Sequence, residues 1–295
     1  MLSILIPIYN YNVYPLALEL HKQCLESGIE FEILCQDDAS GSNFNLINEN
    51  INSLSCSSFK TLQKNIAHRE NRNSLANQAK YDYLLFIDGD SNIINANYII
   101  NYLENIQNYD IVYGGRIHPE ICPSEKQKLR WKYGKFVEDK TTENRKKTPF
   151  QSLLFNNTLI KKDCFNKVKF DLFLKKYGHD DTQISYQLSL LKVKVNHINN
   201  PIEHGDIDTN SLFLLKMKNS LENLKYLYEE KKIDKNFSKL ISLLLLVNKL
   251  KLTYFISKFY LLFEKPIFKQ LEGNNPSLIV FNLFRIGYLC SLKQK

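Results

Sequence analysis

Two aspartates separated by one glycine, Asp88 and Asp90, directly follow the apolar run Tyr83–Ile87. Such a run predicts a buried strand, and carboxylates at its end require water or a cation. Residues two apart in an extended chain point the same way, so both carboxylates are expected to face one site, with Gly89 leaving room for a ligand. Taken alone, the pattern favours a solvated turn, because Asp-Gly is a common turn dipeptide.

The chemistry that these carboxylates could support is metal binding. Two hard oxygen donors side by side suit Mg²⁺ or Mn²⁺, between which they do not discriminate. These ions take one or two protein carboxylates and complete their shell with phosphate oxygens of a substrate.

Other polar side chains follow two further predicted strands. Tyr9 and Asn10 end the first strand, and Asp37 and Asp38 follow the second. Because ligands of open α/β sheets bind beyond the carboxyl ends of the strands, we expect these residues to lie at one edge with Asp88.

The elements that would position them alternate between strands and helices along residues 1–115, which predicts a mostly parallel sheet covered on both faces. The predicted strands are Leu2–Ile8, Phe31–Cys35, Phe59–Gln63, Tyr83–Ile87, Ile111–Tyr113, Gln151–Phe155 and Val193–Ile198. The predicted helices are Pro15–Glu26, Phe44–Ile51, Asn73–Lys80, Ala96–Ile106 and Thr182–Leu191. Residues 118–149 lack clear periodicity, and the chain from Ser211 is predicted to be helical with a break at Glu272–Pro276.

Four segments, in this order and spacing, resemble the family 2 glycosyltransferases with the GT-A fold. The segments are S-I-L-I-P-I-Y-N, F-E-I-L-C-Q-D-D-A-S, N-R-N-S-L-A-N-Q-A and Y-L-L-F-I-D-G-D, and the resemblance covers residues 1–205. It implies an α/β fold with a Rossmann-like, mostly parallel sheet and an inverting transfer of a sugar from a nucleotide-sugar. UDP is the nucleotide that the resemblance favours.

The resemblance also implies roles for individual residues. The nucleotide-binding residues would be Pro7, Tyr9, Asn10, Asp37, Asp38, Arg72, Asp88 and Gly89, and the metal ligands would be Asp88, Asp90 and His204. The chain departs from the family in having Asn73 after Arg72, where glycine is frequent, which affects the positioning of that segment. Alternatives stay open: Asp38 could cap the following helix, Arg72 could pair with Glu70, and Asn10 could satisfy turn backbone.

An inverting transfer needs a base that takes the proton of the acceptor hydroxyl. The stretch K-Y-G-H-D-D-T-Q-I-S-Y-Q-L resembles the family's Gly-x-Glu-Asp segment, so Asp181 matches the catalytic Asp and Asp180 replaces the usual Glu. Either could instead cap the helix that follows, so the choice between them stays open. His179 and Trp131 are expected to line the acceptor pocket, although Trp131 could equally be core.

Composition and charge bound the organisation of the chain. Its 295 residues are 44% hydrophobic and 24% charged, which is typical of a globular protein. Six scattered cysteines without a C-x-x-C pair favour a reducing, cytoplasmic location, and no apolar stretch reaches the roughly 18–20 residues that span a bilayer. We divide the chain into a catalytic domain, 1–210, with nucleotide-binding (1–115) and acceptor-binding (116–210) halves, and a basic helical region, 211–295.

The helical region carries the surplus charge: 15 basic and 6 acidic residues from Ser211 on, against 24 and 25 before it. Lys239–Lys265 mixes Leu, Phe and Tyr with regularly placed lysines. Such helices can lie peripherally on the inner face of the cell membrane. They can equally pack on the catalytic part or on a second subunit, as in a homo-oligomer, and both interpretations stay open.

We therefore expect an inverting glycosyltransferase of the hexosyltransferase type, acting on a glycan or lipid-linked acceptor in surface polysaccharide biosynthesis. A metal-dependent nucleotidyltransferase is the alternative enzyme, but the first strand lacks the Gly-rich basic loop that such an enzyme normally shows after it. A basic nucleic-acid-binding protein is the non-enzymatic alternative. The surplus charge lies in the C-terminal helices, not around the aspartates, so no nucleic-acid partner is expected.

Overall fold

The computed structural model describes residues 1–174 and 176–292. These residues form two compact units that interleave along the chain. The first unit comprises Met1–Ile117, Asp139–Leu172 and Gln187–Asp206. The second comprises His118–Glu138 and the described residues of 173–186 and 207–292.

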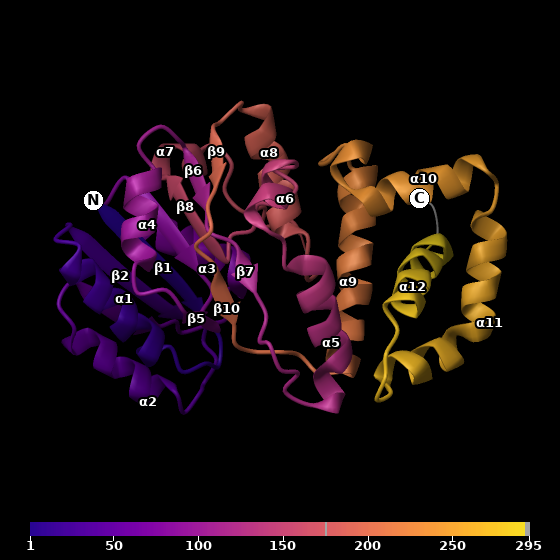
Figure 1. Cartoon of the computed structure of the whole chain (residues 1–295), viewed down its shortest axis with the longest axis horizontal. Helices are drawn as coiled ribbons and strands as arrows, with labels where there is room; N and C mark the ends of the chain where they lie inside the picture. The colour runs from indigo at the N-terminus through magenta and orange to yellow at the C-terminus, as the bar shows by residue number, and fades with distance from the viewer. Residues whose placement is uncertain (175, 293–295) are drawn as a thin grey trace. The chain divides into compact units, whose positions relative to one another are not determined.

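A mixed sheet forms the centre of the first unit, where seven of the described strands follow the order β3-β2-β1-β4-β8-β6-β9 (Figure 1). Their bounds are β1 Leu2–Ile8, β2 Phe31–Asp37, β3 Ser57–Thr61, β4 Tyr83–Ile87, β6 Ile111–Tyr113, β8 Asn157–Lys161 and β9 Val195–His197. β8 is antiparallel to both neighbours and the other pairs are parallel. The predicted α/β fold with a mostly parallel sheet is confirmed.

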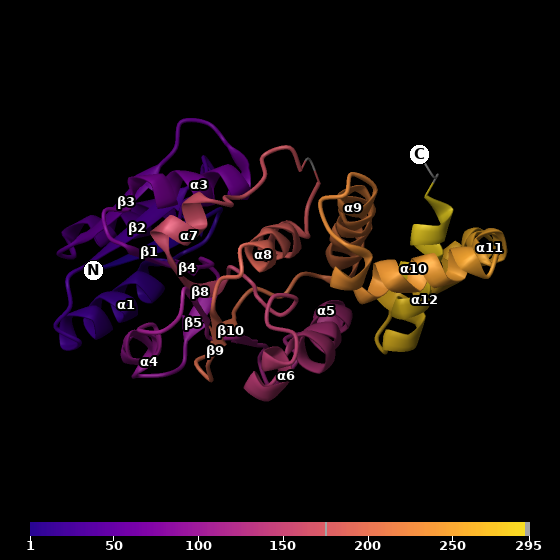
Figure 2. The same ribbon diagram turned by 90° about the horizontal axis from the view of Figure 1, so that it is seen from above.

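Helices cover both faces of this sheet (Figure 2). α1 (Tyr14–Glu26) and α4 (Tyr98–Asn105) lie on one face, and α3 (Ala67–Gln78) and α7 (Lys162–Asn166) lie on the other. Side chains at alternate strand positions serve the two faces, as the pleat requires. Ile4 and Ile6 pack with α1 and α4, whereas Phe86 packs against Phe165 of α7 with ring centroids 4.9 Å apart.

A second, three-stranded sheet has the order β5-β10-β7. Its strands are β5 Ser91–Ile93, β7 Arg116–Ile117 and β10 Ile202–His204. β10 is antiparallel to β5 and parallel to β7. The pairing brings the chain after β9 back to the residues that directly follow Asp90.

A buried amide fastens the middle of the first unit. Asn157, at the start of β8, is fully buried, and its Oδ1 accepts hydrogen bonds from the hydroxyls of Tyr98 and Tyr102, both at 2.6 Å. Its Nδ2 donates to the carbonyls of Gly115 (2.7 Å) and Asn200 (3.0 Å). The Tyr98 hydroxyl and the Asn200 carbonyl depend on this amide, whereas Tyr102 also donates to the backbone carbonyl of residue 157 and Gly115 also accepts from Ile202. Because buried polar groups are normally hydrogen-bonded, this side chain links α4, β8 and the loops after β6 and β9.

Among the differences between the sequence predictions and the structure of the first unit, two are the largest. Gln151–Phe155, predicted as a strand, forms turns, and the strand is Asn157–Lys161. The apolar pattern was misleading because Phe155 is buried without strand geometry, while the polar Asn157 begins the true strand. α3 begins at Ala67 and not at Asn73. The residues before Asn73 are polar and show no apolar periodicity, but several are buried by contacts with distant residues. Asn71 Oδ1, for example, accepts from Gln36 Nε2 at 2.9 Å.

The second unit is helical. Its helices are α5 Lys128–Tyr133, which continues as a π-helix over Gly134–Glu138, then α9 Asn210–Glu229, α10 Lys239–Lys249, α11 Thr253–Glu272 and α12 Leu278–Ser291. The predicted break at Glu272–Pro276 is confirmed, since α11 ends at Glu272 and α12 begins at Leu278. Leu129 of α5 shares a core with Phe213 of α9 and Phe281 of α12, which explains why His118–Glu138 groups with the C-terminal helices. α8 (Asp180–Leu190) begins in this unit and continues into the first.

The hydrogen bonds of Asn157 predict a large effect of its removal. Asn157→Leu keeps the approximate volume but removes four hydrogen bonds and leaves the Tyr98 hydroxyl and the Asn200 carbonyl unpaired. We expect a loss of about 3–5 kcal/mol in the free energy of unfolding, since each buried polar group left unpaired costs about 1–3 kcal/mol. Urea unfolding followed by circular dichroism measures it. Asn199→Leu, at an exposed position nearby, is the control and should change stability by about 0.5 kcal/mol or less.

Candidate functional site

The segment Asp88–Ser91 forms a tight turn at the carboxyl end of β4. The backbone carbonyl of Asp88 accepts from the N–H of Ser91 at 3.2 Å, and the N–H of Asp88 donates to the carbonyl of Asn156 at 3.3 Å. Glycine suits position 89 because a Cβ would lie 3.2 Å from the carbonyl oxygen of Pro7, a tight contact that the neighbouring backbone would have to relieve. The turn is therefore pressed against the end of β1.

Asp88 is held by Arg72, which projects from α3. Arg72 Nη2 donates to Asp88 Oδ1 in an ion pair, and the guanidinium also lies 5.2 Å from the ring centroid of Phe170. The arginine is buried, whereas the side chain of Asp88 keeps 34% of its surface exposed. One edge of this carboxylate is thus fixed while the remainder stays accessible to a ligand.

Asp90 is held by a different partner, His204. Its Oδ2 lies 3.3 Å from His204 Nδ1, because the antiparallel pairing of β10 with β5 sets His204 opposite Ser91. Burial would raise the pKa of Asp90, but the hydrogen bond and charge of His204, with the charge of Arg116, lower it below its usual value. Asp90 Oδ1 is buried with no hydrogen-bond partner among the described residues. Asp90 therefore presents an ionised carboxylate with one oxygen unused.

The structure modifies the expectation that both carboxylates face one site. That expectation assumes an extended chain, but the hydrogen bond between Asp88 and Ser91 makes the segment a turn. Asp88 points to Arg72 and Asp90 points to His204. The two carboxylates consequently have different partners and different environments.

A divalent cation fits the unused oxygen of Asp90. Within residues 1–174 and 176–292 no group of three His, Cys, Asp or Glu side chains gathers as a complete metal site. The pair Asp90 and His204 supplies two donors, however, once the imidazole has lost its proton, and Mg²⁺ or Mn²⁺ in nucleotide enzymes is usually held by one or two protein ligands together with substrate phosphates. The donor set suits a metal that arrives with a nucleotide.

Asp37 and Asp38 at the end of β2 are both buried and both hydrogen-bonded to protein. Asp37 accepts from the backbone N–H and the hydroxyl of Ser40 at 2.9 and 2.6 Å, and from Asn45 at 3.1 Å. Asp38 Oδ1 accepts from the N–H of Ile66 at 2.7 Å, directly before α3. Asp38 therefore orders the entry to the helix that carries Arg72, and nucleobase contact by either aspartate stays a prediction.

Tyr9 and Asn10 follow β1 in an exposed loop. Tyr9 is 64% exposed, and Asn10 has a φ of 55°, in the left-handed region that asparagine tolerates. The end of this loop is held by a hydrogen bond, in which Asn48 Oδ1 accepts from the N–H of Val13 at 2.9 Å. An exposed aromatic ring on an anchored loop is available for stacking.

Two residues that the sequence did not single out belong to this site. Tyr11 has a raised pKa because of burial and the negative charges of Asp90 and Asp206, so its hydroxyl stays protonated close to Asp90. Arg116, in β7, contributes to the lowered pKa of Asp90. Arg116 could have been identified from the sequence, because it follows Gly114-Gly115 at the carboxyl end of the predicted strand Ile111–Tyr113. Ligands of open α/β sheets bind beyond such strand ends.

The predicted base residues belong to the second unit. Asp180 and Asp181 form the first turn of α8, where carboxylates stabilise the helix N-terminus. Gly178 precedes them with a φ of 91°, and a Cβ there would lie 2.8 Å from Ser220 of α9. The entry to α8 is thus fixed against α9, which leaves the two aspartates on an ordered segment.

His179 and Trp131, the predicted acceptor residues, also lie in the second unit. His179 Nδ1 is 2.9 Å from the hydroxyl of Thr182, and burial together with the charge of Arg285 lowers the pKa of His179 to about 4. It is therefore neutral near pH 7. The indole N–H of Trp131 donates to the carbonyl of Pro119 at 2.8 Å, and its ring meets Phe136 edge-on. Acceptor contact by either residue stays a prediction.

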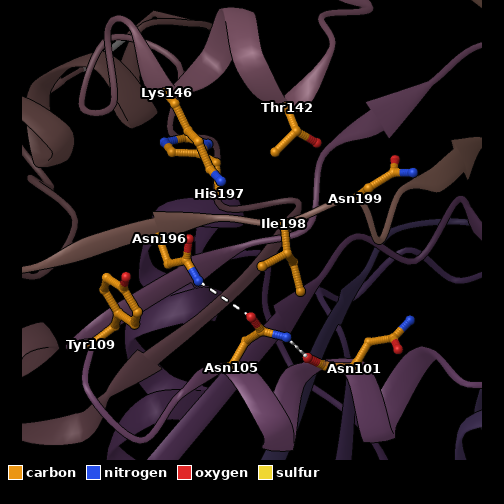
Figure 3. Close-up of a pocket in the computed structure, with 9 residues that line it drawn as sticks. All are labelled: Asn101, Asn105, Tyr109, Thr142, Lys146, Asn196, His197, Ile198 and Asn199. Atoms are coloured by element: carbon orange, nitrogen blue, oxygen red, sulfur yellow. Dashed lines mark hydrogen bonds between the residues drawn. The ribbon is translucent and has the colours of Figure 1, made fainter.

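A polar pocket of about 480 Å³ in the first unit contains none of the predicted site residues (Figure 3). It is lined by Asn101, Asn105, Tyr109, Thr142, Lys146, Asn196, His197, Ile198 and Asn199. Several lining amides already bond to one another, as when Asn105 Nδ2 donates to the carbonyl of Asn101 at 2.9 Å. The pocket lies along β9 and α4 and is a feature apart from the aspartate turn.

Comparisons with known proteins identify the family and the fold. The family model described as "Glycosyl transferase family 2" matches residues 3–169. The chain is similar to the solved structure of S. aureus TarS 1–349 in complex with UDP-GlcNAc, with a TM-score of 0.54 at 15% identity over 97% of this chain and 90% of that one. It is also similar to TarS 1–349 in complex with UDP (TM-score 0.52, 17% identity, 88% and 71% covered).

A third similar structure is the mannosyltransferase PcManGT from Pyrobaculum calidifontis in complex with GDP-Man and Mn²⁺, with a TM-score of 0.51 at 10% identity over 76% of this chain and 63% of that one. Of full-length TarS the chain covers 38%. No curated protein matches the sequence. At these identities the structural similarities establish the fold alone.

The ion pair of Arg72 and Asp88 can be measured with a double-mutant cycle of Arg72→Met and Asp88→Asn. Because the arginine is buried and the aspartate partly exposed, we expect a coupling energy of about 1–2 kcal/mol in unfolding free energy. The exposed pair Lys22–Glu26 on α1 is the matched control and should give about 0.3–0.5 kcal/mol. Equal coupling in the two pairs would contradict the assigned role of Arg72.

Proposed function

The chain belongs to glycosyl transferase family 2, and on this premise we propose that it transfers a sugar from a UDP-sugar to a glycan or lipid-linked acceptor, with inversion at the anomeric carbon. The transfer would serve the synthesis of a surface polysaccharide or glycolipid. TarS is solved with UDP and with UDP-GlcNAc, and PcManGT is solved with GDP-Man, which supports a nucleotide-sugar donor. A cytoplasmic location fits such donors.

One observation carries the proposal: the buried, unpaired Oδ1 of Asp90 beside His204, at the carboxyl end of a strand in the family-matched region. A buried carboxylate oxygen without a partner costs free energy unless a ligand completes it. The lowered pKa of Asp90 keeps the carboxylate ionised near neutral pH and so ready for a cation.

In the proposed donor complex, Asp90 and His204 hold a divalent cation, with Asp88 beside them. When bound, Mg²⁺ or Mn²⁺ neutralises the charge that grows on the leaving diphosphate. Arg72 fixes the orientation of Asp88, and Tyr9 and Asn10 border the nucleotide from the loop after β1. The Mn²⁺ in the PcManGT complex supports this choice of metal.

Asp181 is the proposed base. It takes the proton from the acceptor hydroxyl as that oxygen attacks the anomeric carbon. Its support is the match of its segment to the family's Gly-x-Glu-Asp pattern and the ordered entry to α8 at Gly178. Asp180, which is buried, is the proposed helix-stabilising partner. The neutral His179 beside them can hydrogen-bond an acceptor hydroxyl without competing for its proton.

Calorimetric titration of UDP tests the donor site. We expect binding with Mn²⁺ that weakens strongly in EDTA, and Asp90→Asn should lower the affinity with Mn²⁺ by about tenfold or more, since bonds to charged groups contribute about 1.5–3 kcal/mol. Asp82→Asn, at an exposed position just before β4, is the matched control and should bind like wild type. Metal-independent binding, or full affinity in Asp90→Asn, would exclude the proposed metal site.

Turnover of the donor that the titrations identify tests the base. Asp181→Asn should lower kcat by about a hundredfold to ten-thousandfold, the usual contribution of a general base, while UDP affinity stays unchanged. Asp180→Asn is the comparison and should act mainly on stability. If Asp180→Asn abolished turnover and Asp181→Asn did not, the two roles would be exchanged.

A further inference from the structure

The C-terminal helices expose a large set of apolar side chains to solvent. On α10, α11, α12 and the link between α10 and α11 these are Leu243, Leu246, Leu250, Leu252, Tyr254, Phe255, Phe259, Leu261, Leu262, Phe263, Ile279 and Leu283. Phe255 is 67% exposed and Leu262 is 76% exposed. Soluble monomeric proteins rarely expose so many large apolar groups together, and such surfaces usually contact a protein or a membrane.

Four of these residues form a continuous stripe along α11, here called the α11 stripe: Phe255, Phe259, Leu262 and Phe263. Residues three and four apart are neighbours on a helix surface, so this spacing places them on one side. The rings of Phe259 and Phe263 lie 4.6 Å apart. The stripe extends over more than two helical turns.

The packing of the second unit does not use this stripe. The opposite side of α11 buries Tyr260 and Leu271 against α12, where a Cβ at Gly287 would lie 2.7 Å from the Tyr260 side chain. That close approach already supplies α11 with an intramolecular partner (Figure 1). The stripe is therefore a second apolar face on a helix whose first face is satisfied.

Lysines border the stripe on one flank. Lys258 and Lys265 each follow a stripe residue by three positions, Lys269 continues the row one turn on, and all three are exposed. Of the two acidic residues on α11, Glu264 is bonded instead to Lys218 at 3.0 Å and to the hydroxyl of Tyr260 at 2.8 Å. The other, Glu272, is exposed three positions after Lys269 at the end of the helix, so three lysines face one carboxylate along this flank. The flank is consequently cationic.

We propose that α11 binds the surface of an anionic lipid bilayer, with the α11 stripe at the boundary of the acyl chains and the lysine row among the headgroups. An amphipathic helix with aromatic and aliphatic residues on one side and lysines beside them suits that position. Anionic lipid attracts each lysine near its surface. This inference does not depend on the proposed sugar transfer.

A span across the bilayer is a separate matter. Within the described residues no single helix is both long and apolar enough to cross a membrane; α10 and α11 reach that threshold only together, and the chain bends by 112° between them.

A second copy of the chain is the alternative partner that could cover the α11 stripe. Two-fold pairing of antiparallel α11 helices through the stripe would place both lysine rows on the same side of the interface, and like charges oppose such contact.

Flotation with lipid vesicles tests the proposal. The full chain should float with vesicles of phosphatidylcholine and phosphatidylglycerol in a ratio of roughly two to one, and less with phosphatidylcholine alone. The triple variant Phe255→Ser, Phe259→Ser, Leu262→Ser should lose about a hundredfold or more in partitioning to both. The triple variant Lys258→Glu, Lys265→Glu, Lys269→Glu should lose about a hundredfold for the anionic vesicles and little for the neutral ones.

A matched control replaces three exposed leucines of the first unit, Leu18, Leu25 and Leu190, with serine and should float like wild type. Thermal unfolding and UDP titration of every variant show that the fold and the donor site are intact, so a failure of sugar transfer and a failure of membrane binding are separate results. The proposal is overturned if the wild-type chain does not float with anionic vesicles, or if the variant with Phe255, Phe259 and Leu262 replaced by serine still floats. Light scattering that shows a wild-type dimer dissociating in the serine variant would assign the stripe to a second copy instead.

Discussion

The geometry of the first unit depends on the buried amide of Asn157. β8 runs antiparallel between β4 and β6, and at its first residue four polar groups from separate parts of the chain meet in the core. One carboxamide satisfies all four because it offers two donors and two acceptor positions. Gly114 completes the arrangement, since a Cβ there would lie 2.3 Å from the carbonyl of Asn200. Few other side chains could occupy this position without leaving a buried polar group unpaired.

The same anchor determines where the aspartates lie. Asn157 pairs with Ile87, the last residue of β4, and the neighbouring Asn156 accepts the backbone N–H of Asp88. The chain then turns at once into β5, whose pairing with β10 brings His204 to Asp90. A hydrogen-bond network in the core thus sets the register of a strand, the strand ends at a turn, and the turn gives each carboxylate its own partner. The positions of Asp88 and Asp90 at this edge are a consequence of the register.

The second unit shows a different use of apolar residues. Its helices are apolar on more than one side, so the sequence of each helix alone does not show which side is buried in the core. Tyr260, opposite Gly287, identifies the buried side of α11, and the remaining apolar residues are left on the surface beside lysines. The short segment His118–Glu138 joins the same core through Leu129, although the residues before and after it in the sequence belong to the first unit. Here the division of the chain follows packing and not chain order.

The sequence by itself determined the class of fold, the bounds of β1 and β4, and the aspartates at the end of β4, because these features are local: strand periodicity, helix periodicity and polar residues at strand ends are visible in a few adjacent positions. Tertiary structure alone decided that Asn157 begins a core strand, since a buried amide makes sense only with its distant partners present. It also decided that His204 meets Asp90 while Arg72 meets Asp88, and which side of α11 is buried. Pairing between strands and packing between helices depend on residues far apart in the chain, and no local pattern specifies such partners.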